Sequence, residues 1–225
     1  MTTVLNLPDL SRLYDAPAER IAEFQEKGHT VLRGVASPEE IAAYKPEIES
    51  AVEADSRETR PIDERDTYGK AFLQVPNLWR RHEGPRRFVL SSRFAKIAAD
   101  LLGASGVRLY HDQALFKEGG GGQTPWHQDQ YYWPLSSDQT ITMWMPLIDI
   151  PPEIGSMTFA SGSQKLGYLG ATRSPMSRTG TSRRWSRRRG SRWTRTGHSR
   201  QATRRFTRAG SCTARRPTRR GRCAP

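Results

Sequence analysis

A histidine and an aspartate stand two positions apart in an aromatic-rich stretch of this chain, PWHQDQYYWP, residues 125–134. On a β-strand, alternate side chains point to the same face, about 6.6 Å apart along the backbone. His127 and Asp129 would then converge on one metal ion, with Gln128 on the other face. An imidazole and a carboxylate are two of the three ligands in the two-histidine, one-carboxylate triad that binds Fe(II) in non-haem oxygenases. The pair therefore indicates a candidate metal site that still needs a second histidine.

The pair alone is a weak signal, because an isolated His-x-Asp spacing arises readily by chance. His111 and Asp112 do not form a second such pair, since neighbours on a strand point to opposite faces. His29, His82 and His111 are interpreted as surface or core residues. The metal prediction thus depends on what surrounds His127 and Asp129.

Composition divides the 225 residues into two parts. Of the 36 lysines and arginines, 18 are arginines of residues 171–225, which contain no acidic residue. Residues 1–170 therefore carry 18 basic and 23 acidic side chains, so the formal charge of +13 belongs to the tail. We interpret 1–170 as the N-terminal part of one domain and 171–225 as an Arg-rich, disordered tail.

The tail lacks the side chains needed to form a core. Its large apolar residues are Met176, Trp185, Trp193 and Phe206. Ordering 55 residues costs roughly 55–110 kcal/mol of backbone entropy at about 1–2 kcal/mol each, whereas a buried apolar side chain contributes about 1.5–3 kcal/mol. We expect that the tail does not fold by itself.

The order of predicted elements is helices first and strands after them. Three helices are predicted: residues 17–27, a segment that begins with Ser37-Pro38-Glu39-Glu40, and a segment that begins with residues 91–94. A strand is predicted at 29–35, between the first two helices, and a surface loop at 55–70. Residues 107–116, 126–133, 140–150 and a segment from 155 read as strands. This order predicts an α+β, mainly β, fold with a sandwich or jelly roll.

Residues 17–170 resemble the phytanoyl-CoA dioxygenase family of Fe(II)- and 2-oxoglutarate-dependent oxygenases. The resemblance rests on an ordered series of segments rather than on any one of them: GHTVLRGVASPEEI, FLQVPNLW, YHDQALFKEGGGGQTPWHQDQYYWP, ITMWMPLIDI and GSMTFASGSQK. It implies a double-stranded β-helix (jelly roll, cupin-like) with N-terminal helices. About 150 residues take part, so the C-terminal half of the barrel is expected to be missing.

The resemblance also assigns residues and cofactors. It implies that His127 and Asp129 are ligands of Fe(II), and that Gln113 and Trp144 line the site of the co-substrate 2-oxoglutarate, with O2 as the oxidant. For Gln113 an outward strand residue, and for Trp144 a plain core tryptophan, are the alternatives. Related halogenases lack the carboxylate, so Asp129 favours hydroxylation of a small organic substrate, with 2-oxoglutarate converted to succinate and CO2. The family does not fix the substrate.

The family's distal histidine and its 2-oxoglutarate arginine have no counterpart in the sequence as written. His198 lies in RTGHSRQA, which matches no segment of the family. The tail is rich in Arg, Ser and Gly, which is the composition expected when GC-rich coding DNA is translated in the wrong reading frame. Reading one base back, a histidine codon can span Cys212 and Thr213, and residues 201–220 can read GDATFHAGWVLHRAPPNPT, which resembles the distal segment. We therefore interpret the chain from about residue 171 as a frameshift product and expect this polypeptide to be inactive.

Two other function classes remain open. A basic tail can bind nucleic acid through phosphate contacts, and a jelly roll can be a non-catalytic binding module. Because we ascribe the tail to a frameshift, we expect no specific nucleic-acid partner.

We also expect no membrane partner, since there is no apolar run of about 20 residues. Both cysteines, Cys212 and Cys223, lie in the tail, so a cysteine-free body without a signal-peptide pattern suits the cytoplasm. The sequence does not give the oligomeric state.

Overall fold

The computed structural model describes residues 6–122, 124–133, 135–150 and 157–168, and the backbone of three strands within residues 192–215. Five α-helices of the described chain precede most of its strands: α1 (Ala18–Lys27), α2 (Pro38–Asp55), α3 (Thr67–Ala71), α4 (Glu83–Val89) and α5 (Ser92–Leu102). The strands are β1 (His29–Leu32), β2 (Leu73–Pro76), β3 (Gln113–Phe116), β4 (His127–Gln128), β5 (Ile141–Trp144), β6 (Met157–Ser161), β7 (Arg192–Arg195), β8 (Arg204–Arg208) and β9 (Cys212–Arg215). Short 3-10 helices lie at Ile62–Glu64, Leu78–Arg80, Asp129–Tyr132 and Ser163–Leu166.

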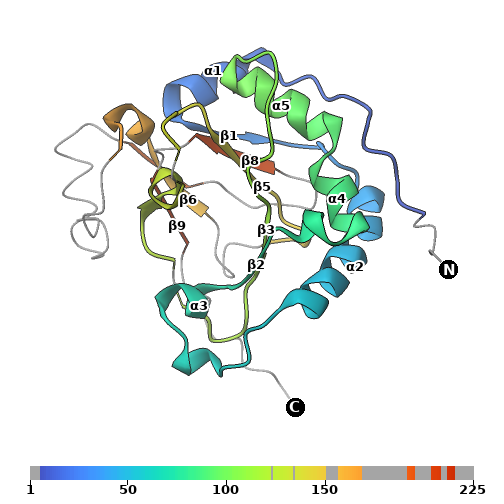
Figure 1. Ribbon diagram of the computed structural model, residues 1–225. Helices are drawn as coiled ribbons and strands as arrows, with labels where there is room; N and C mark the ends of the chain where they lie inside the picture. The colour runs from blue at the N-terminus through green and yellow to red at the C-terminus, as the bar shows by residue number, and fades with distance from the viewer. Residues whose placement is uncertain are drawn as a thin grey trace.

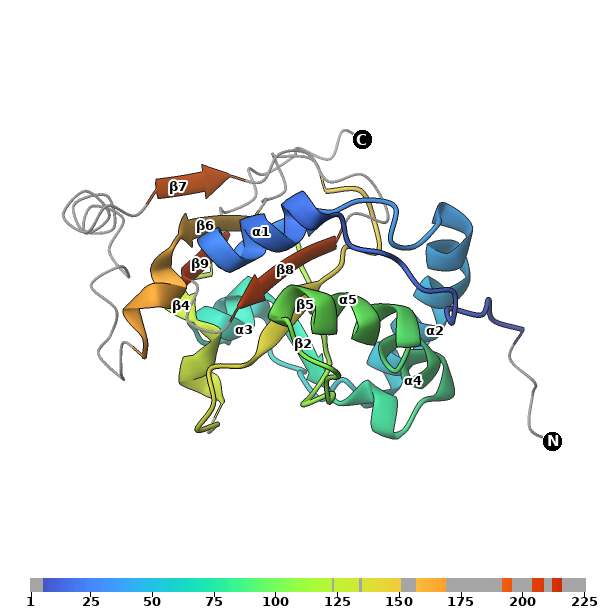
Figure 2. The same ribbon diagram turned by 90° about the horizontal axis from the view of Figure 1, so that it is seen from above.

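The strands form three sheets, with orders β1-β8-β5, β2-β3 and β4-β9-β6-β7. Every neighbouring pair in them is antiparallel. Helix α1 lies along β1 and β8, and α5 lies against α1 and β5, so the helices cover one side of the first sheet (Figures 1 and 2). This arrangement agrees with helices packed on a mainly antiparallel β structure.

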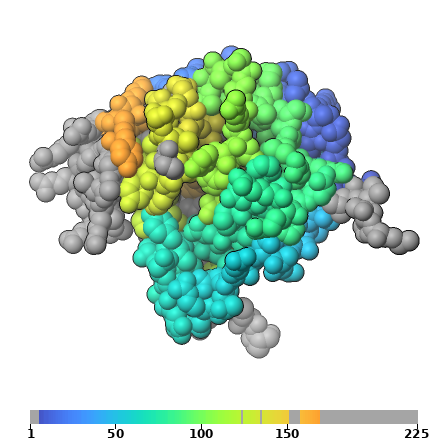
Figure 3. Space-filling view, in the orientation of Figure 1, coloured from blue at the N-terminus to red at the C-terminus, as the bar shows by residue number. Residues whose placement is uncertain are grey.

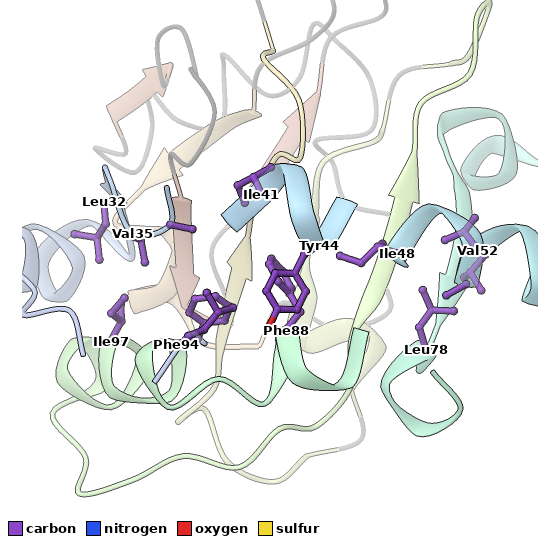
Figure 4. Close-up of a cluster of buried hydrophobic side chains, with 14 of the residues drawn as sticks. Leu32, Val35, Ile41, Tyr44, Ile48, Val52, Leu78, Phe88, Phe94 and Ile97 are labelled. Atoms are coloured by element: carbon purple, nitrogen blue, oxygen red, sulfur yellow. The ribbon is translucent and has the colours of Figure 1, made fainter. Parts of the chain in front are cut away.

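The main core lies between the helices and the sheets. Phe24 of α1, Tyr44 of α2 and Ile97 of α5 are at most 2 % exposed. Tyr44, Phe88 and Phe94 pack as a chain of ring contacts, with centroid distances of 5.1 and 5.4 Å, and Figure 4 shows this cluster between the helices. Alternate residues of the β5 segment, Ile141, Met143, Met145 and Leu147, pack against the same core.

The two larger sheets are joined by contacts across the space between them. His29 of β1 stacks on Phe159 of β6 with ring centroids 4.7 Å apart, and His29 Nε2 lies 2.8 Å from Ser161 Oγ. At another point, the Thr142 hydroxyl of β5 donates to Asp129, which directly follows β4, at 2.8 Å. The β1-β8-β5 and β4-β9-β6-β7 sheets therefore face each other, as the two sheets of a jelly roll do.

The predicted helices are confirmed, including the capping box: Glu40 N donates to Ser37 Oγ, and Ser37 N donates to Glu40 Oε2. The surface-loop prediction is wrong at its end, because α3 begins at Thr67. There the Asp66 carboxylate caps the helix by accepting from Gly69 N. The sequence analysis also missed strand β2 and helix α4.

The predicted strands are mostly shorter than expected. The 140–150 strand ends at Trp144, and Pro146, which cannot donate to a ladder, follows two residues later. The 107–116 strand begins only at Gln113, and the 29–35 strand ends at Leu32, just before Gly34 at a φ of 65°. The 126–133 strand is wrong beyond Gln128, where a 3-10 turn replaces it and Trp133 N bonds back to Gln130 O.

The tail prediction lies largely outside the described residues. Of residues 171–225 the structure describes the backbone of β7, β8 and β9, each paired with strands of the preceding part. The predicted disorder of the tail and the missing half of the barrel stay predictions.

Candidate metal centre

The structure brings His127 and Asp129 together, although Asp129 does not lie on a strand. His127 is the first residue of β4, and Asp129 opens the 3-10 helix that follows. His127 Nε2 and Asp129 Oδ1 lie 3.3 Å apart, and the two side chains are 20 % and 21 % exposed. Two metal ligands at right angles, with bonds of about 2.1 Å, would have their donor atoms about 3 Å apart. The pair therefore has the spacing of two ligands of one ion.

Backbone and side-chain partners fix the orientation of both groups. His127 Nδ1 lies 2.9 Å from Pro125 O. Because a carbonyl oxygen only accepts, Nδ1 carries the hydrogen and Nε2 is the nitrogen that faces Asp129. On the other side, Asp129 Oδ2 accepts from Thr142 Oγ1 at 2.8 Å, which leaves Oδ1 towards the histidine. Such outer contacts orient the ligands of metal sites.

The electrostatics of the pair agree with this geometry. Burial lowers the pKa of the His127 imidazole, but the hydrogen bond and negative charge of Asp129, together with Pro125 O, outweigh it and raise that pKa overall. A positive charge between Nε2 and Oδ1 is thus favoured. A divalent cation supplies such a charge when it displaces the proton.

The set of ligands is incomplete. Among residues 6–168, apart from the gaps given above, no group of three His, Cys, Asp or Glu side chains is arranged to hold a metal ion. Two ligands do not complete a triad for iron. His198 lies outside the described residues. The side chains present therefore fit two thirds of the expected centre and no more.

The two predicted co-substrate residues lie in different places. Trp144 is half-buried on β5, two residues from Thr142 and hence on the same face as the residue that binds Asp129. Gln113 is exposed on β3 of the two-stranded sheet, where its side-chain amide donates to Gln74 Oε1. The position of Trp144 suits a pocket beside Asp129, and the exposure of Gln113 suits the alternative of an outward strand residue. Both roles stay predictions.

The sequence analysis missed Thr142 and Pro125 as the groups that orient the pair. The sequence could have indicated Thr142, because it stands two positions before Trp144 in the alternating stretch TITMW. It could not have indicated Pro125, since that residue contacts His127 through its backbone oxygen.

An aromatic cleft adjoins the pair. Tyr132 contacts the His127 ring edge-on at a centroid distance of 5.7 Å, and its hydroxyl bonds to that of Tyr68 of α3. Burial, followed by the bond to Tyr68, raises the pKa of the Tyr132 phenol above its ordinary range. Tyr132 also lines a cavity of about 650 Å³, together with Gln130, Tyr131, Trp133, Leu135, Ser136, Asp138, Gln164, Gly167 and Tyr168. In the space-filling view, the yellow segment and the orange segment that supply this lining lie side by side (Figure 3).

The chain is similar to a known protein family, to a curated protein and to solved structures. Residues 24–204 match the sequence profile of a family described as phytanoyl-CoA dioxygenase (PhyH). The match extends past residue 170, the end of the resemblance described above. A curated protein from Stutzerimonas stutzeri, a probable alpha-ketoglutarate-dependent hypophosphite dioxygenase, is 26 % identical over 155 residues, which are 66 % of this chain and 54 % of that protein. The chain thus matches about half the length of this relative.

Solved structures show the fold. The non-heme alpha-ketoglutarate-dependent carbocyclase SnoK from nogalamycin biosynthesis has a TM-score of 0.73 at 22 % identity, covering 95 % of this chain and 81 % of that one. The epimerase SnoN with Fe3+, alpha-ketoglutarate and nogalamycin RO has a TM-score of 0.71 at 21 % identity, and the match covers 90 % of this chain and 77 % of SnoN. EctD from S. alaskensis, with 2-oxoglutarate and 5-hydroxyectoine, has a TM-score of 0.69 at 16 % identity, and the match covers 94 % of this chain and 76 % of EctD. All three are described with alpha-ketoglutarate (2-oxoglutarate), SnoK as a non-heme protein and SnoN with Fe3+, and this chain shares their fold.

No described helix is sufficiently long and apolar to cross a membrane.

Proposed function

This chain belongs to the phytanoyl-CoA dioxygenase family, and on that premise we propose that it derives from an Fe(II)- and 2-oxoglutarate-dependent dioxygenase that hydroxylates a small organic substrate. The observation that carries the proposal is the convergence of His127 Nε2 and Asp129 Oδ1 at 3.3 Å. A histidine and a carboxylate with fixed orientations are two of the three protein ligands of a facial Fe(II) triad. The carboxylate favours hydroxylation, as the family resemblance implies.

The aromatic cleft is the proposed entrance for the substrate. Its volume of about 650 Å³ lies within the range of small-molecule sites, and Tyr132 connects its wall to the His127 ring. Trp144 is proposed to line the co-substrate site from the face of β5 that also carries Thr142. Gln113 is proposed as a further co-substrate residue on the family resemblance alone.

The 225-residue chain is proposed to lack turnover. The side chains described in the structure supply two ligands of a centre that needs three, and the sequence offers no counterpart of the 2-oxoglutarate arginine. We ascribe this loss to a change of reading frame near residue 171. The protein before the frame change would have been the enzyme.

The test is conversion of 2-oxoglutarate into succinate with Fe(II) and O2. The protein translated in the restored frame should form succinate, and its His127→Ala variant should lose that activity. The 225-residue chain should form none. Succinate formation by the unaltered chain, or its absence from a folded, iron-loaded restored protein, would overturn the proposal.

A further inference from the structure

The aromatic cleft beside the metal pair has walls from two parts of the chain. One wall lies within residues 130–138 and the other within residues 164–168, in the yellow and orange segments of Figure 3. In the first wall, the rings of Tyr131 and Tyr132 are nearly perpendicular, at 87° with centroids 5.0 Å apart, so they form a corner and not a stack. In the second wall, Tyr168 is 61 % exposed. The cleft therefore has aromatic rings on both sides.

The charge of this region is acidic. Residues 118–164 contain five Asp or Glu and no Lys or Arg. Among the described residues that line the cleft, the one charged side chain is that of Asp138, which is exposed. Lys165 lies in the 3-10 helix of the second wall but is not one of these lining residues. A phosphate or carboxylate ligand would thus meet a carboxylate in the described lining, and no cation.

The two glutamines of the lining leave acceptor atoms unused. Gln130 Nε2 donates to Leu135 O and Ser137 O, both at 3.2 Å. Gln164 Nε2 donates to Glu26 O at 3.1 Å. Because backbone carbonyls only accept, these contacts fix which end of each amide is the nitrogen. Both Oε1 atoms are buried and have no hydrogen-bond partner among the described residues, so the negative ends of two amide dipoles in this wall are not compensated.

We propose that the cleft selects an organic cation, an amine or a quaternary ammonium compound, and that Asp138 and the rings of the two walls determine this specificity. The proposal rests on the proposed function, since it names the substrate class of that site. Ring faces attract an ammonium group within about 6 Å of the ring centroid, and a carboxylate adds a favourable charge. Tyr132 lines the cleft and contacts the His127 ring. A cation bound there would lie beside the metal pair.

The test is equilibrium binding of choline and of 3,3-dimethyl-1-butanol to the full 225-residue chain. The two probes have the same shape, but in the alcohol a neutral carbon replaces the charged nitrogen. Binding is followed by tryptophan fluorescence, because Trp133 is one of the lining residues. Choline should bind at least about fivefold more tightly than the alcohol, since cation–π contacts are lost with the charge.

Substitutions on each wall locate the probe in the cleft. Asp138→Asn should weaken choline binding about three- to fivefold and leave binding of the alcohol unchanged. Glu53→Gln removes an exposed carboxylate of α2 that does not line the cleft and should change neither. Tyr168→Leu should weaken choline binding by a similar factor, whereas Tyr168→Phe retains the ring and should not. Asp138 and Tyr168 are both exposed, so neither substitution removes a core contact.

Equal affinities for the two probes, or a choline affinity that neither Asp138→Asn nor Tyr168→Leu lowers, would overturn the proposal. These measurements use no iron, no 2-oxoglutarate and no turnover. A preference for choline together with an inactive restored protein would therefore refute the proposed function alone. Succinate formation by the restored protein, with no preference for choline, would refute the cation specificity alone.

Discussion

The buried imidazole of His29 predicts that the protein loses stability in mild acid. The residue is 2 % exposed, stacks on Phe159 and bonds to Ser161 Oγ. Burial lowers the pKa of the His29 imidazole most strongly. The negative charge of Glu23 raises this pKa and the positive charge of Lys27 lowers it further, so that it falls from 6.5 to about 4. Protonating His29 would place a charge between the two sheets.

The sign and size follow from proton linkage. A histidine whose pKa is lowered by folding binds fewer protons in the native state, so its contribution is present above about pH 6.5 and is lost as the pH falls towards 4. A shift of this size corresponds to roughly 3 kcal/mol when the loss is complete, and to about 2 kcal/mol between pH 7.5 and pH 5.

The assay is urea unfolding, followed by tryptophan fluorescence at pH 7.5, 6 and 5, for the unaltered chain and His29→Gln. Glutamine retains a group that bonds to Ser161 but does not titrate, so the carboxylates that titrate in both proteins cancel in the comparison. The unaltered chain should lose about 2 kcal/mol more than His29→Gln between pH 7.5 and pH 5. Parallel pH dependences of the two proteins would refute the assignment of His29 as a buried, neutral group.

Two further predictions concern the metal pair and the helix packing. In the protein translated in the restored frame, Thr142→Val removes the hydroxyl that holds Asp129 Oδ2 and should weaken Co(II) binding about 10- to 100-fold. Unchanged affinity would show that the hydroxyl does not position Asp129. Gly84→Ala places a Cβ 2.6 Å from Glu47 Cβ and should lower the free energy of unfolding by about 1–3 kcal/mol, despite the higher helix propensity of alanine. Gly106→Ala, with nothing within 4 Å of its Cβ, is the matched control and should change the unfolding free energy by less than about 1 kcal/mol; equal urea midpoints for the two variants would contradict the overlap at Gly84.

The helices were predictable because their signals are local. Ser37 and Glu40 form the expected capping box, and Gly28 and Gly103 end α1 and α5 in the left-handed conformation. The strands were less predictable, since their extent depends on partners that are distant in sequence. The 107–116 segment pairs only from Gln113, where β2 is available.

The candidate site was likewise predictable only in part. The prediction that His127 and Asp129 converge agrees with the structure, but the strand geometry behind it does not hold at Asp129. A 3-10 turn brings the carboxylate to the histidine, with Thr142 holding its far oxygen. No local pattern contains that contact, because it crosses between two sheets, and the same is true of the register of His127 with Thr213.

The coding DNA from codon 170 to codon 220 tests the central claim most directly. If this chain is a dioxygenase that lost its third ligand to a change of frame, the frame one base back continues without a stop codon and places a histidine codon across Cys212 and Thr213. That histidine would then occupy the strand position opposite His127. An early stop in that frame, or any other codon at the 212–213 junction, would contradict the account.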